Sequence, residues 1–564
     1  MKTTKISHIA HLAELCSQAG IRQIVLSPGS RNAPLVIAFD SHPEIETFVV
    51  HDERSASFFA LGLAEASGKP VALACTSGSA PVNYGPGIVE AYYRQIPLLV
   101  LTADRPSQWI DQGDGQTIRQ KKMFANFIKA DFELPNQPNS EEVLISDKIV
   151  NQALNLLVNQ PTGPVHINIP LNEPLYNTQD FIPNPVNELV LNNNLELNDE
   201  EVAFIRENYQ KLEKKLVLIG QLNPSEIDIS TLKPLLTDPS VAFLVENTSN
   251  IQDFENVCHC IDRTLSIINE DEIQKYQPDL LITLGGAIIS KRIKAFLRKC
   301  KPQQNWRVGN FMIDEDTYAS KTKSFKVNPK SFFKIFKNNN IVPTSTFGNL
   351  WKQADFLAEQ RHIEFLNSVP FSDFKAFELI IDTLPEFANL HMGNSSVVRY
   401  CQLFNPIQSV KYYSNRGVSG IDGSSSTAAG FARNTLEQLN VVISGDISFF
   451  YDSNAWWNAY LSPNLRIILI NNGGGGIFEI IDGPAKSDQS KSFIAPFEAN
   501  AELLSKAFNL NYITASSENE MMNLFELFYS EFENKRPVVF EIKTKGLSNA
   551  KILKSYFSYI KDNQ

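Results

Sequence analysis

A carboxylate and a side-chain amide follow two consecutive strand-like runs in the last third of the chain. Residues 441–443 lead into Asp446, and residues 466–470 lead into Asn472 and a run of glycines. Because the carboxyl ends of neighbouring parallel strands meet at one edge of a sheet, these two side chains are expected to lie close together. Carboxylate and amide oxygens, with a backbone carbonyl, are the hard ligands that Mg²⁺ takes beside a phosphate. The spacing therefore predicts a metal site that binds a phosphorylated cofactor.

A second candidate for chemistry stands early in the chain. Glu53 follows the strand-like run 47–50 and precedes a helical stretch, residues 55–66, for which Gly68 is a plausible stop. Taken alone, this carboxylate could simply help to cap the helix. Together with the downstream metal motif, it becomes a candidate acid–base group that works through a cofactor. Because Glu53 and Asp446 are far apart in the sequence, such a cofactor must lie between two domains.

Parallel sheets are the elements that must position these residues. Short β-branched runs that end in Gly, Ser, Asp or Asn and lead into helical periodicity recur along the chain in three groups. Polar stretches at residues 183–187 and 337–343 separate the groups. We therefore predict an α/β protein of three doubly wound parallel-sheet domains, with the divisions 1–182, 183–345 and 346–564. The central domain carries no Gly-x-Gly-x-x-Gly fingerprint, so no dinucleotide cofactor is expected there.

Composition and charge exclude several classes of function. The 564 residues are 43% hydrophobic and 20% charged, and the net charge is −11, which disfavours nucleic acid and anionic membranes as partners. Six dispersed cysteines without a Cys-x-x-Cys pattern argue against a disulfide scaffold. The N-terminus lacks the apolar core of a signal peptide, and no apolar run is long enough to span a bilayer. We expect a cytoplasmic protein.

Several further motifs carry a resemblance to a known family. In chain order they are Ser-Pro-Gly-Ser-Arg (27–31), His-Asp-Glu-Arg-Ser-Ala (51–56), Thr-Ser-Gly-Ser-Ala (76–80), Thr-Ala-Asp-Arg-Pro (102–106), Ser-Asn-Arg-Gly (414–417) and Gly-Ile-Asp-Gly (420–423). With the metal motif, this set resembles the 2-succinyl-5-enolpyruvyl-6-hydroxy-3-cyclohexene-1-carboxylate synthases of menaquinone biosynthesis, which depend on thiamine diphosphate. Other thiamine enzymes share the glutamate and the metal pair but not the arginine-bearing loops. The resemblance covers essentially the whole chain.

The resemblance implies a thiamine diphosphate site between the first domain, which would bind the pyrimidine, and the third, which would bind the diphosphate. Glu53 would bond to N1′ of the aminopyrimidine and promote proton removal from thiazolium C2, and Gln116 would face the reaction centre; these are the predicted catalytic residues. The predicted cofactor-binding residues are Glu53, Gly393, Asn394, Ile421, Asp446, Ile447, Ser448 and Asn472. The metal, Mg²⁺ or Mn²⁺, would be held by Asp446, Asn472 and Gly474.

Two positions depart from the family pattern. Ile447 stands where the diphosphate-binding signature usually has Gly, and Gly115 stands where most members have Asn. The bulkier Ile447 narrows the room beside the phosphate, and Gly115 removes one side-chain hydrogen bond from the loop that carries Gln116. Both departures therefore concern loops that the resemblance assigns to the active site.

The implied reaction joins two dicarboxylates. Its substrates are 2-oxoglutarate, which loses CO₂, and isochorismate, which accepts the succinyl unit in a 1,4-addition; cationic side chains match such carboxylates well. Ser395 and Arg399 would hold the oxoglutarate-derived part, and the other cationic residues would mainly serve isochorismate. The predicted substrate-binding residues are Ser30, Arg31, Arg105, Lys291, Arg292, Ser395, Arg399, Arg416, Ile477 and Phe478.

In related thiamine enzymes the two halves of the site usually come from different subunits. The resemblance therefore implies a homodimer or homotetramer with active sites at subunit interfaces. Two other functions stay open at this point: another thiamine-dependent 2-oxo acid decarboxylase or carboligase, and a non-catalytic binding protein that retains the fold.

Overall fold

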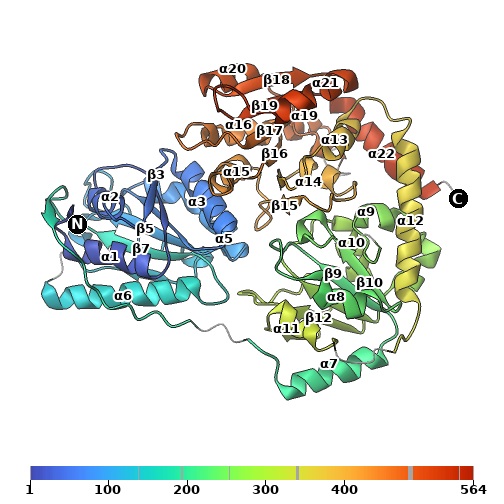
Figure 1. Cartoon of the computed structure of the whole chain (residues 1–564), viewed down its shortest axis with the longest axis horizontal. Helices are drawn as coiled ribbons and strands as arrows, with labels where there is room; N and C mark the ends of the chain where they lie inside the picture. Colours follow the sequence, from blue (N-terminus) through green and yellow to red (C-terminus); the bar gives the residue numbers. More distant parts are fainter. Residues whose placement is uncertain are drawn as a thin grey trace.

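Three parallel β-sheets flanked by helices make up the chain (Figure 1). The computed structural model describes residues 2–136, 139–191, 195–252, 255–337, 342–480, 487–544 and 546–562. The three sheets have six, five and six strands, and every strand pair within them is parallel. The predicted α/β class with three doubly wound parallel sheets is confirmed, whereas the exact domain divisions stay a prediction.

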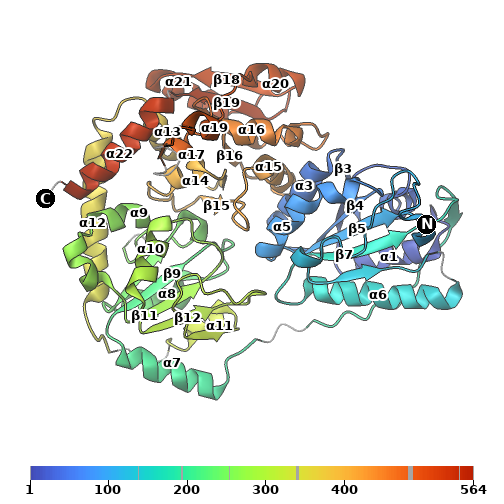
Figure 2. The same ribbon diagram turned by 180° about the vertical axis from the view of Figure 1, so that it is seen from behind.

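The first sheet has the strand order β3-β2-β4-β5-β7-β6. Its strands are β2 (Gln23–Leu26), β3 (Glu46–Val49), β4 (Val71–Cys75), β5 (Leu98–Asp104), β6 (Asp131–Glu133) and β7 (Val165–Pro170). Its helices are α1 (Ser7–Gln18), α2 (Ala33–Asp40), α3 (Glu53–Ser67), α4 (Ala80–Asn83), α5 (Gly85–Tyr93) and α6 (Ser140–Val158). α1 and α6 pack on one face and α3 and α5 on the other (Figure 2). A short antiparallel pair, β1 (Lys2–Thr4) and β8 (Thr178–Asp180), lies beside this sheet.

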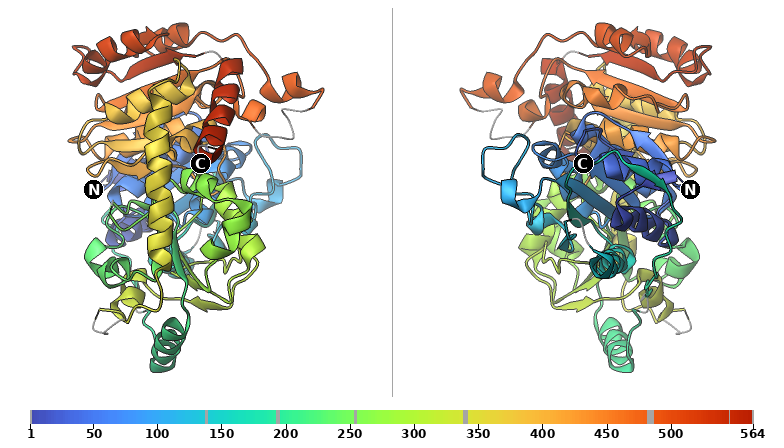
Figure 3. Two further views of the ribbon diagram at one scale, coloured as in Figure 1. Left: turned by 90° about the vertical axis from the view of Figure 1, so that its right-hand side faces the viewer. Right: turned by 90° about the vertical axis from the view of Figure 1, so that its left-hand side faces the viewer.

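The central sheet has the order β10-β9-β11-β12-β13. Its strands are β9 (Lys215–Ile219), β10 (Val241–Val245), β11 (Leu280–Leu284), β12 (Gln304–Val308) and β13 (Lys323–Phe325). Its helices are α7 (Asp199–Lys211), α8 (Ile229–Leu236), α9 (Ile261–Ile267), α10 (Lys291–Cys300) and α11 (Pro329–Lys334). The long α12 (Phe347–Leu366) then packs against α9 and β10 and reaches the C-terminal α22 (Gly546–Asp562), which joins this layer to the third sheet (Figure 3).

The third sheet has the order β15-β14-β16-β17-β19-β18. Its strands are β14 (Asn389–Met392), β15 (Lys411–Tyr413), β16 (Asn440–Gly445), β17 (Leu465–Asn471), β18 (Asn511–Ala515) and β19 (Val538–Lys543). The helices that precede or link them are α13 (Asp373–Asp382), α14 (Ser396–Cys401), α15 (Ser424–Arg433), α16 (Asp446–Tyr451), α17 (Ile477–Ile480), α19 (Ser490–Ile494), α20 (Ala501–Ala507) and α21 (Glu518–Tyr529).

The first and third sheets share one topology. Counted in chain order within each sheet, their strands lie in the spatial order 2-1-3-4-6-5. The direction of the order reverses between β2 and β4 in the first sheet and between β14 and β16 in the third. Ligands of open α/β sheets bind beyond the carboxyl ends of the strands at such a reversal. The loops after β2, β14 and β16 are therefore the places where the two sheets can bind a ligand.

A continuous apolar core joins the first and third domains. α3 lies against α15, and buried residues of both helices belong to one cluster with the inner faces of both sheets. The backbones approach closely because glycine stands at each crossing point: a Cβ on Gly430 would lie 2.1 Å from the carbonyl oxygen of Phe59, and one on Gly62 would lie 2.0 Å from that of Thr427. The first turn of α3 is thereby held against the third domain.

Adding a methyl group at this crossing is expected to destabilise the protein. Gly430→Ala places a Cβ inside the van der Waals contact with a backbone atom that cannot rotate away, and overpacking of this kind costs about 1–3 kcal/mol of unfolding free energy. Chemical denaturation at fixed protein concentration measures this change in the free energy of unfolding. Gly85→Ala is the matched control, because a Cβ there meets nothing within 4 Å. Equal unfolding midpoints for the two variants would refute the close crossing.

Two further observations bear on the expectations from composition. None of the helices in the described parts of the chain combines the length and the hydropathy needed to cross a membrane. Each of the six cysteines is free, and five of them are buried.

Candidate active site

Glu53 is the first residue of α3, and a neighbouring residue caps the helix. The carboxylate of Asp52 accepts hydrogen bonds from the N–H groups of Arg54 (2.8 Å) and Ser55 (3.3 Å), and Gly68 ends the helix with a φ of 64°. The Glu53 side chain is therefore not needed as the cap. It is half-buried, and this burial raises its pKa above the ordinary value, with the charge of Asp52 acting in the same direction. Loss of its proton is therefore less favourable than for an exposed glutamate.

Side-chain hydrogen bonds hold the start of α3 against the third domain. Asn454 donates to the Asp52 carboxylate over 2.5 Å, and the hydroxyls of Ser55 and Ser426 are 2.9 Å apart. Ser426 lies in α15, and Asn454 follows α16. Within this chain, Glu53 thus sits where the first domain meets the two helices that flank β16. The prediction that the two halves of the site come from different subunits is not tested by a single chain and stays a prediction.

The predicted metal pair lies on neighbouring strands, as the spacing indicated. β16 and β17 are paired in register, with Gly445 opposite Ile470, so the loops after them share one edge of the sheet. Asp446 is the first residue of α16, and its buried carboxylate accepts hydrogen bonds from the N–H groups of Gly473 and Gly474, both at 2.9 Å. One carboxylate thus ties the two loops together.

The amide of Asn472 is oriented by a residue that the sequence analysis missed. Its Nδ2 donates to Oδ2 of Asp373 over 2.9 Å, so its Oδ1 is left to face a cation. Asp373 is the first residue of α13, is 2% exposed, and also accepts from the hydroxyl of Thr544 (2.5 Å). No motif marks Asp373, since only the fold brings α13 to this loop. Outer partners of this kind set the orientation and affinity of a metal ligand.

The donor set fits Mg²⁺ beside a diphosphate. It consists of one carboxylate (Asp446), one amide oxygen (Asn472) and the main-chain carbonyl of Gly474 on a buried loop. Within the described ranges, no three His, Cys, Asp or Glu side chains gather into a metal site, so this mixed oxygen set is the candidate. Hard oxygen ligands with room for phosphate oxygens suit Mg²⁺ rather than a soft metal.

Two predicted cofactor-binding side chains, those of Ser448 and Asn394, form hydrogen bonds with the protein itself. Ser448 donates its hydroxyl to the carbonyl of Ile421 over 2.6 Å, which fixes the loop that carries this large aliphatic residue. Asn394 donates to the carbonyls of Asn415 (2.7 Å) and Gly420 (2.6 Å). Their side chains therefore shape the loops around the site. Of the other two candidates, Ile447 donates its N–H to Asp446 (2.7 Å) and Gly393 donates to the carbonyl of Ile443 (2.8 Å).

Two arginines from the first domain form a cationic pair. Arg31, which follows β2, is buried; it donates to the carbonyl of Leu171 over 2.9 Å and lies 3.4 Å from Glu173. Arg105, which follows β5, lies 3.6 Å from Asp114. Burial lowers the pKa of Arg31, and the charge of Arg105 lowers it further. The Nε atoms of both arginines are buried without a hydrogen-bond partner, so the pair can accept an anion; Ser30 is exposed beside it.

A second arginine pair comes from the third domain. Arg399 donates to the carbonyl of Ser395 over 2.7 Å, and Ser395 has a φ of 71°, which a non-glycine residue rarely adopts. Arg416 is buried, donates to Oδ1 of Asn394 over 2.7 Å, and has an Nε without a partner. Burial lowers the pKa of both guanidiniums, and the charge of Arg399 also lowers that of Arg416. Two guanidiniums this close favour a bound carboxylate.

The remaining candidates lie at the edges of the site. Lys291 and Arg292 begin α10 and are exposed; Arg292 lies over the ring of Phe557 (4.0 Å). The charges of Arg292 and Arg399 both act on Asp262, so this helix approaches the second arginine pair. Ile477 and Phe478 lie in α17 and are half-buried. Gln116 is exposed, with a φ of 56°, and its Cα would lie 3.2 Å from a Cβ on Gly78.

Comparison with known proteins supports what this geometry indicates. Residues 8–123 match the family described as the thiamine pyrophosphate enzyme, N-terminal thiamine pyrophosphate-binding domain. That domain faces a second one of the same topology, and the chain is an enzyme of the thiamine-diphosphate-dependent class.

Full-length relatives define the enzyme more closely. Proteins named 2-succinyl-5-enolpyruvyl-6-hydroxy-3-cyclohexene-1-carboxylate synthase are 41% identical in Flavobacterium psychrophilum, over 98% of both chains, and 37% identical in Porphyromonas gingivalis, over 98% of this chain and 97% of the other. The protein of that name in Bacteroides thetaiotaomicron is 35% identical over 98% of this chain and 99% of its own length. The chain belongs to this synthase family.

Proposed function

We propose that the protein decarboxylates 2-oxoglutarate and adds the succinyl unit to isochorismate, releasing CO₂ and forming 2-succinyl-5-enolpyruvyl-6-hydroxy-3-cyclohexene-1-carboxylate for menaquinone biosynthesis. Two arginine pairs carry this proposal, because both contain a buried guanidinium Nε–H without a hydrogen-bond partner: those of Arg31 and Arg105 in the first pair and that of Arg416 in the second. Each substrate is a dicarboxylate, and the guanidinium fork binds carboxylates in a bidentate manner. Two arginine pairs suit two such substrates.

Thiamine diphosphate supplies the nucleophilic carbon and the electron sink of such a reaction when it is bound. Glu53 holds and moves a proton at the pyrimidine end; it lies at the start of α3, and burial raises the pKa of its carboxyl group. Asp446, Asn472 and the Gly474 carbonyl hold the metal, Mg²⁺ or Mn²⁺, on the diphosphate. Ile421, on the loop that Ser448 fixes, would contact the cofactor when it is bound.

Binding of the two substrates divides between the domains. Arg399 and Ser395 serve the distal carboxylate of the oxoglutarate-derived part, and Arg31, Arg105 and Arg416 serve isochorismate. Lys291 and Arg292 approach from the central domain, and Ser30 supports Arg31. Apolar Ile477 and Phe478 wall the cavity, and Gln116 provides a polar group near the reaction centre. The homodimer or homotetramer and the three domain divisions belong to the same proposal.

A direct assay tests the proposed reaction. Purified protein with thiamine diphosphate and Mg²⁺ is expected to consume isochorismate only when 2-oxoglutarate is present, with equimolar release of CO₂. Pyruvate should not replace 2-oxoglutarate, because it lacks the distal carboxylate that the arginines bind. Equal use of pyruvate would favour a different thiamine-dependent decarboxylase. Absence of both CO₂ release and isochorismate loss would refute the proposal.

A further inference from the structure

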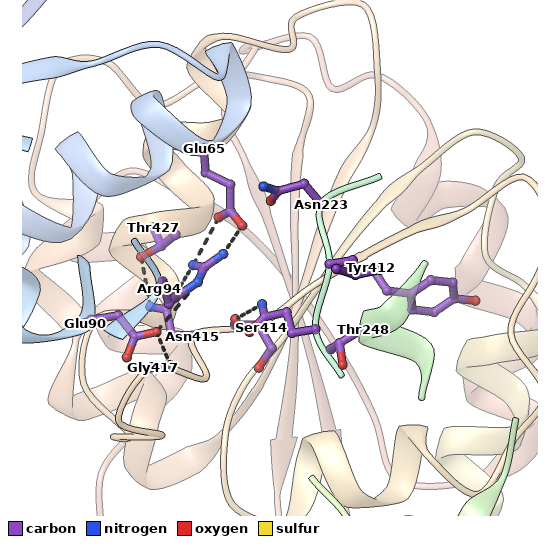
Figure 4. Close-up of polar contacts among 12 residues, drawn as sticks. Glu65, Glu90, Arg94, Asn223, Thr248, Tyr412, Ser414, Asn415, Gly417 and Thr427 are labelled. Carbon is purple, nitrogen blue, oxygen red and sulfur yellow. Dashed lines mark hydrogen bonds and ion pairs between the residues drawn. The ribbon is translucent and has the colours of Figure 1, made fainter. Parts of the chain in front are cut away.

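The loop that carries Arg416 lies where the first, central and third domains meet. Residues 414–418 follow β15 and lead toward α15 in the third domain. From the central domain, Gln221 donates to the carbonyl of Ser414 over 2.8 Å. From the first domain, α5 presents Glu90 and Arg94 to the other side of the loop (Figure 4). The position of this loop thus depends on contacts with two other domains.

Glu90 binds the main chain of the loop through both carboxylate oxygens. Oε1 accepts a hydrogen bond from the N–H of Gly417 over 2.8 Å, and Oε2 accepts one from the N–H of Val418 over 2.9 Å. Glu90 is 1% exposed, so water does not compete for these bonds. A carboxylate that accepts two consecutive backbone N–H groups fixes both the position and the direction of that segment.

Arg94 and Glu65 stabilise Glu90 in this position; we call the two hydrogen bonds from Gly417 and Val418 to Glu90 the clamp. The Arg94 guanidinium forms an ion pair with Glu65 of α3 and lies 3.9 Å from Oε1 of Glu90. Its Nη1 also donates to Oδ1 of Asn415 over 3.3 Å, and Asn415 donates in turn to the hydroxyl of Thr427 (2.9 Å). The side chains of Arg94 and Glu65 are 7% and 3% exposed. The cluster is therefore a buried ionic network, and moving the loop would break its hydrogen bonds away from water.

The packing at Gly417 leaves no room for a side chain. A Cβ there would lie 2.7 Å from the Glu90 carbonyl oxygen and 3.1 Å from Cγ of Arg94. The residue next to this close contact is Arg416, whose guanidinium donates to Asn394 and keeps an unpartnered, buried Nε. Because the clamp starts one residue after Arg416, a small shift of the loop displaces the guanidinium directly.

We propose that Glu90 is a positioning residue, which fixes the main chain beside Arg416 and so aims that guanidinium at a substrate carboxylate. The inference rests on the proposed function, in which Arg416 serves the isochorismate side. It goes beyond that function because Glu90 lies on the face of α5 that packs against the loop and acts only through the backbone of another domain. Neither Glu90 nor Arg94 lies in any of the sequence motifs from which the site residues were predicted.

Glu90→Gln is the first test, because glutamine keeps the size but offers an NH₂ group where one backbone N–H needs an acceptor. We expect KM for isochorismate to rise by about tenfold, the cost of one lost charge-assisted hydrogen bond. KM for 2-oxoglutarate and the affinity for thiamine diphosphate should change less than about twofold. In Glu90→Gln with Arg416→Ala, KM should be no higher than in Arg416→Ala alone. An unchanged KM for isochorismate, or additive effects, would overturn the proposal.

A matched control separates positioning from general destabilisation. Asp147→Asn alters the contact between Asp147 of α6 and His11 of α1, whose Nδ1 and Oδ2 atoms are 3.0 Å apart; this contact lies in the same domain but far from the loop. The substitution should lower the melting temperature without changing either KM. If Glu90→Gln does not fold, Gly417→Ala moves the same backbone and should produce the same rise in KM for isochorismate alone; a rise in both KM values would overturn the proposal.

Hydrogen–deuterium exchange provides a readout that does not depend on the reaction. In Glu90→Gln, the peptide that contains the amides of Gly417 and Val418 should exchange faster than in the wild type, while peptides of α6 stay unchanged. Unchanged protection would overturn the clamp itself. Loss of protection in a protein whose wild type does not consume isochorismate would instead refute the proposed function and leave the clamp intact.

Discussion

Glu53→Gln is expected to lower turnover by about 10²–10⁴-fold, the range that general acid–base catalysis contributes. Glutamine has the size and one hydrogen-bond donor of the protonated carboxyl, so it can still contact the pyrimidine, but it cannot release and recover a proton. Glu53 is half-buried, and this burial raises the pKa of its carboxyl group, so the neutral amide is a reasonable replacement for it at this position. Cofactor affinity should therefore stay within about threefold.

Steady-state turnover and calorimetric titration with thiamine diphosphate measure the two quantities separately. Glu44→Gln is the matched control, because Glu44 is exposed on the turn before β3 and should keep full activity. Turnover close to that of the wild type in Glu53→Gln would remove the assigned role. A large loss of cofactor affinity would show instead that Glu53 acts mainly in binding.

Asp446→Ala is expected to have the second large effect, on binding of the metal and the diphosphate. The carboxylate is the only charged member of the proposed donor set, and it also holds the N–H groups of Gly473 and Gly474. Loss of a residue that only hydrogen-bonds to a metal ligand lowers metal affinity by about 10–100-fold. Loss of the Asp446 ligand itself should therefore lower metal affinity by at least about 100-fold. Excess Mg²⁺ should restore only part of the activity, because the loop geometry is lost as well.

Titration of the metal in the presence of thiamine diphosphate checks this expectation. Glu437→Ala, an exposed acidic position before β16 in the same domain, is the control and should bind both ligands normally. Metal and cofactor affinities in Asp446→Ala that match this control would show that the site lies elsewhere.

Local patterns were sufficient for the class of fold and for the neighbouring positions of the proposed metal ligands. The β-branched runs became parallel strands, and the runs before Asp446 and Asn472 became neighbours in one sheet. The helical stretch predicted over residues 55–66 begins two residues earlier, at Glu53 itself, and ends at Ser67. These features depend on residues close in sequence, such as the Asp52 cap and the Gly68 stop, which is why the sequence reveals them.

Several strands could not be predicted in this way. β14 and β15 have four and three residues and begin with Asn389 and Lys411. β14 pairs with β15 on one side and with β16 on the other, whereas β15 is the edge strand and pairs with β14. This support from neighbouring strands is not visible in so short a run. The loops after these two strands carry Gly393, Ser395 and Arg416, so those residues were identified by resemblance rather than by an expected strand.

The sequence by itself identified the residues that we propose do the chemistry: Glu53, the oxygen ligands around Asp446 and the arginines in their motifs. Only the tertiary structure decided how they are held. Asp373 orients the Asn472 amide, and Glu90 clamps the loop beside Arg416. The physical reason is that both carboxylates act across long sequence separations on groups in other elements. No local pattern records such contacts, because they exist only once the sheets have packed together.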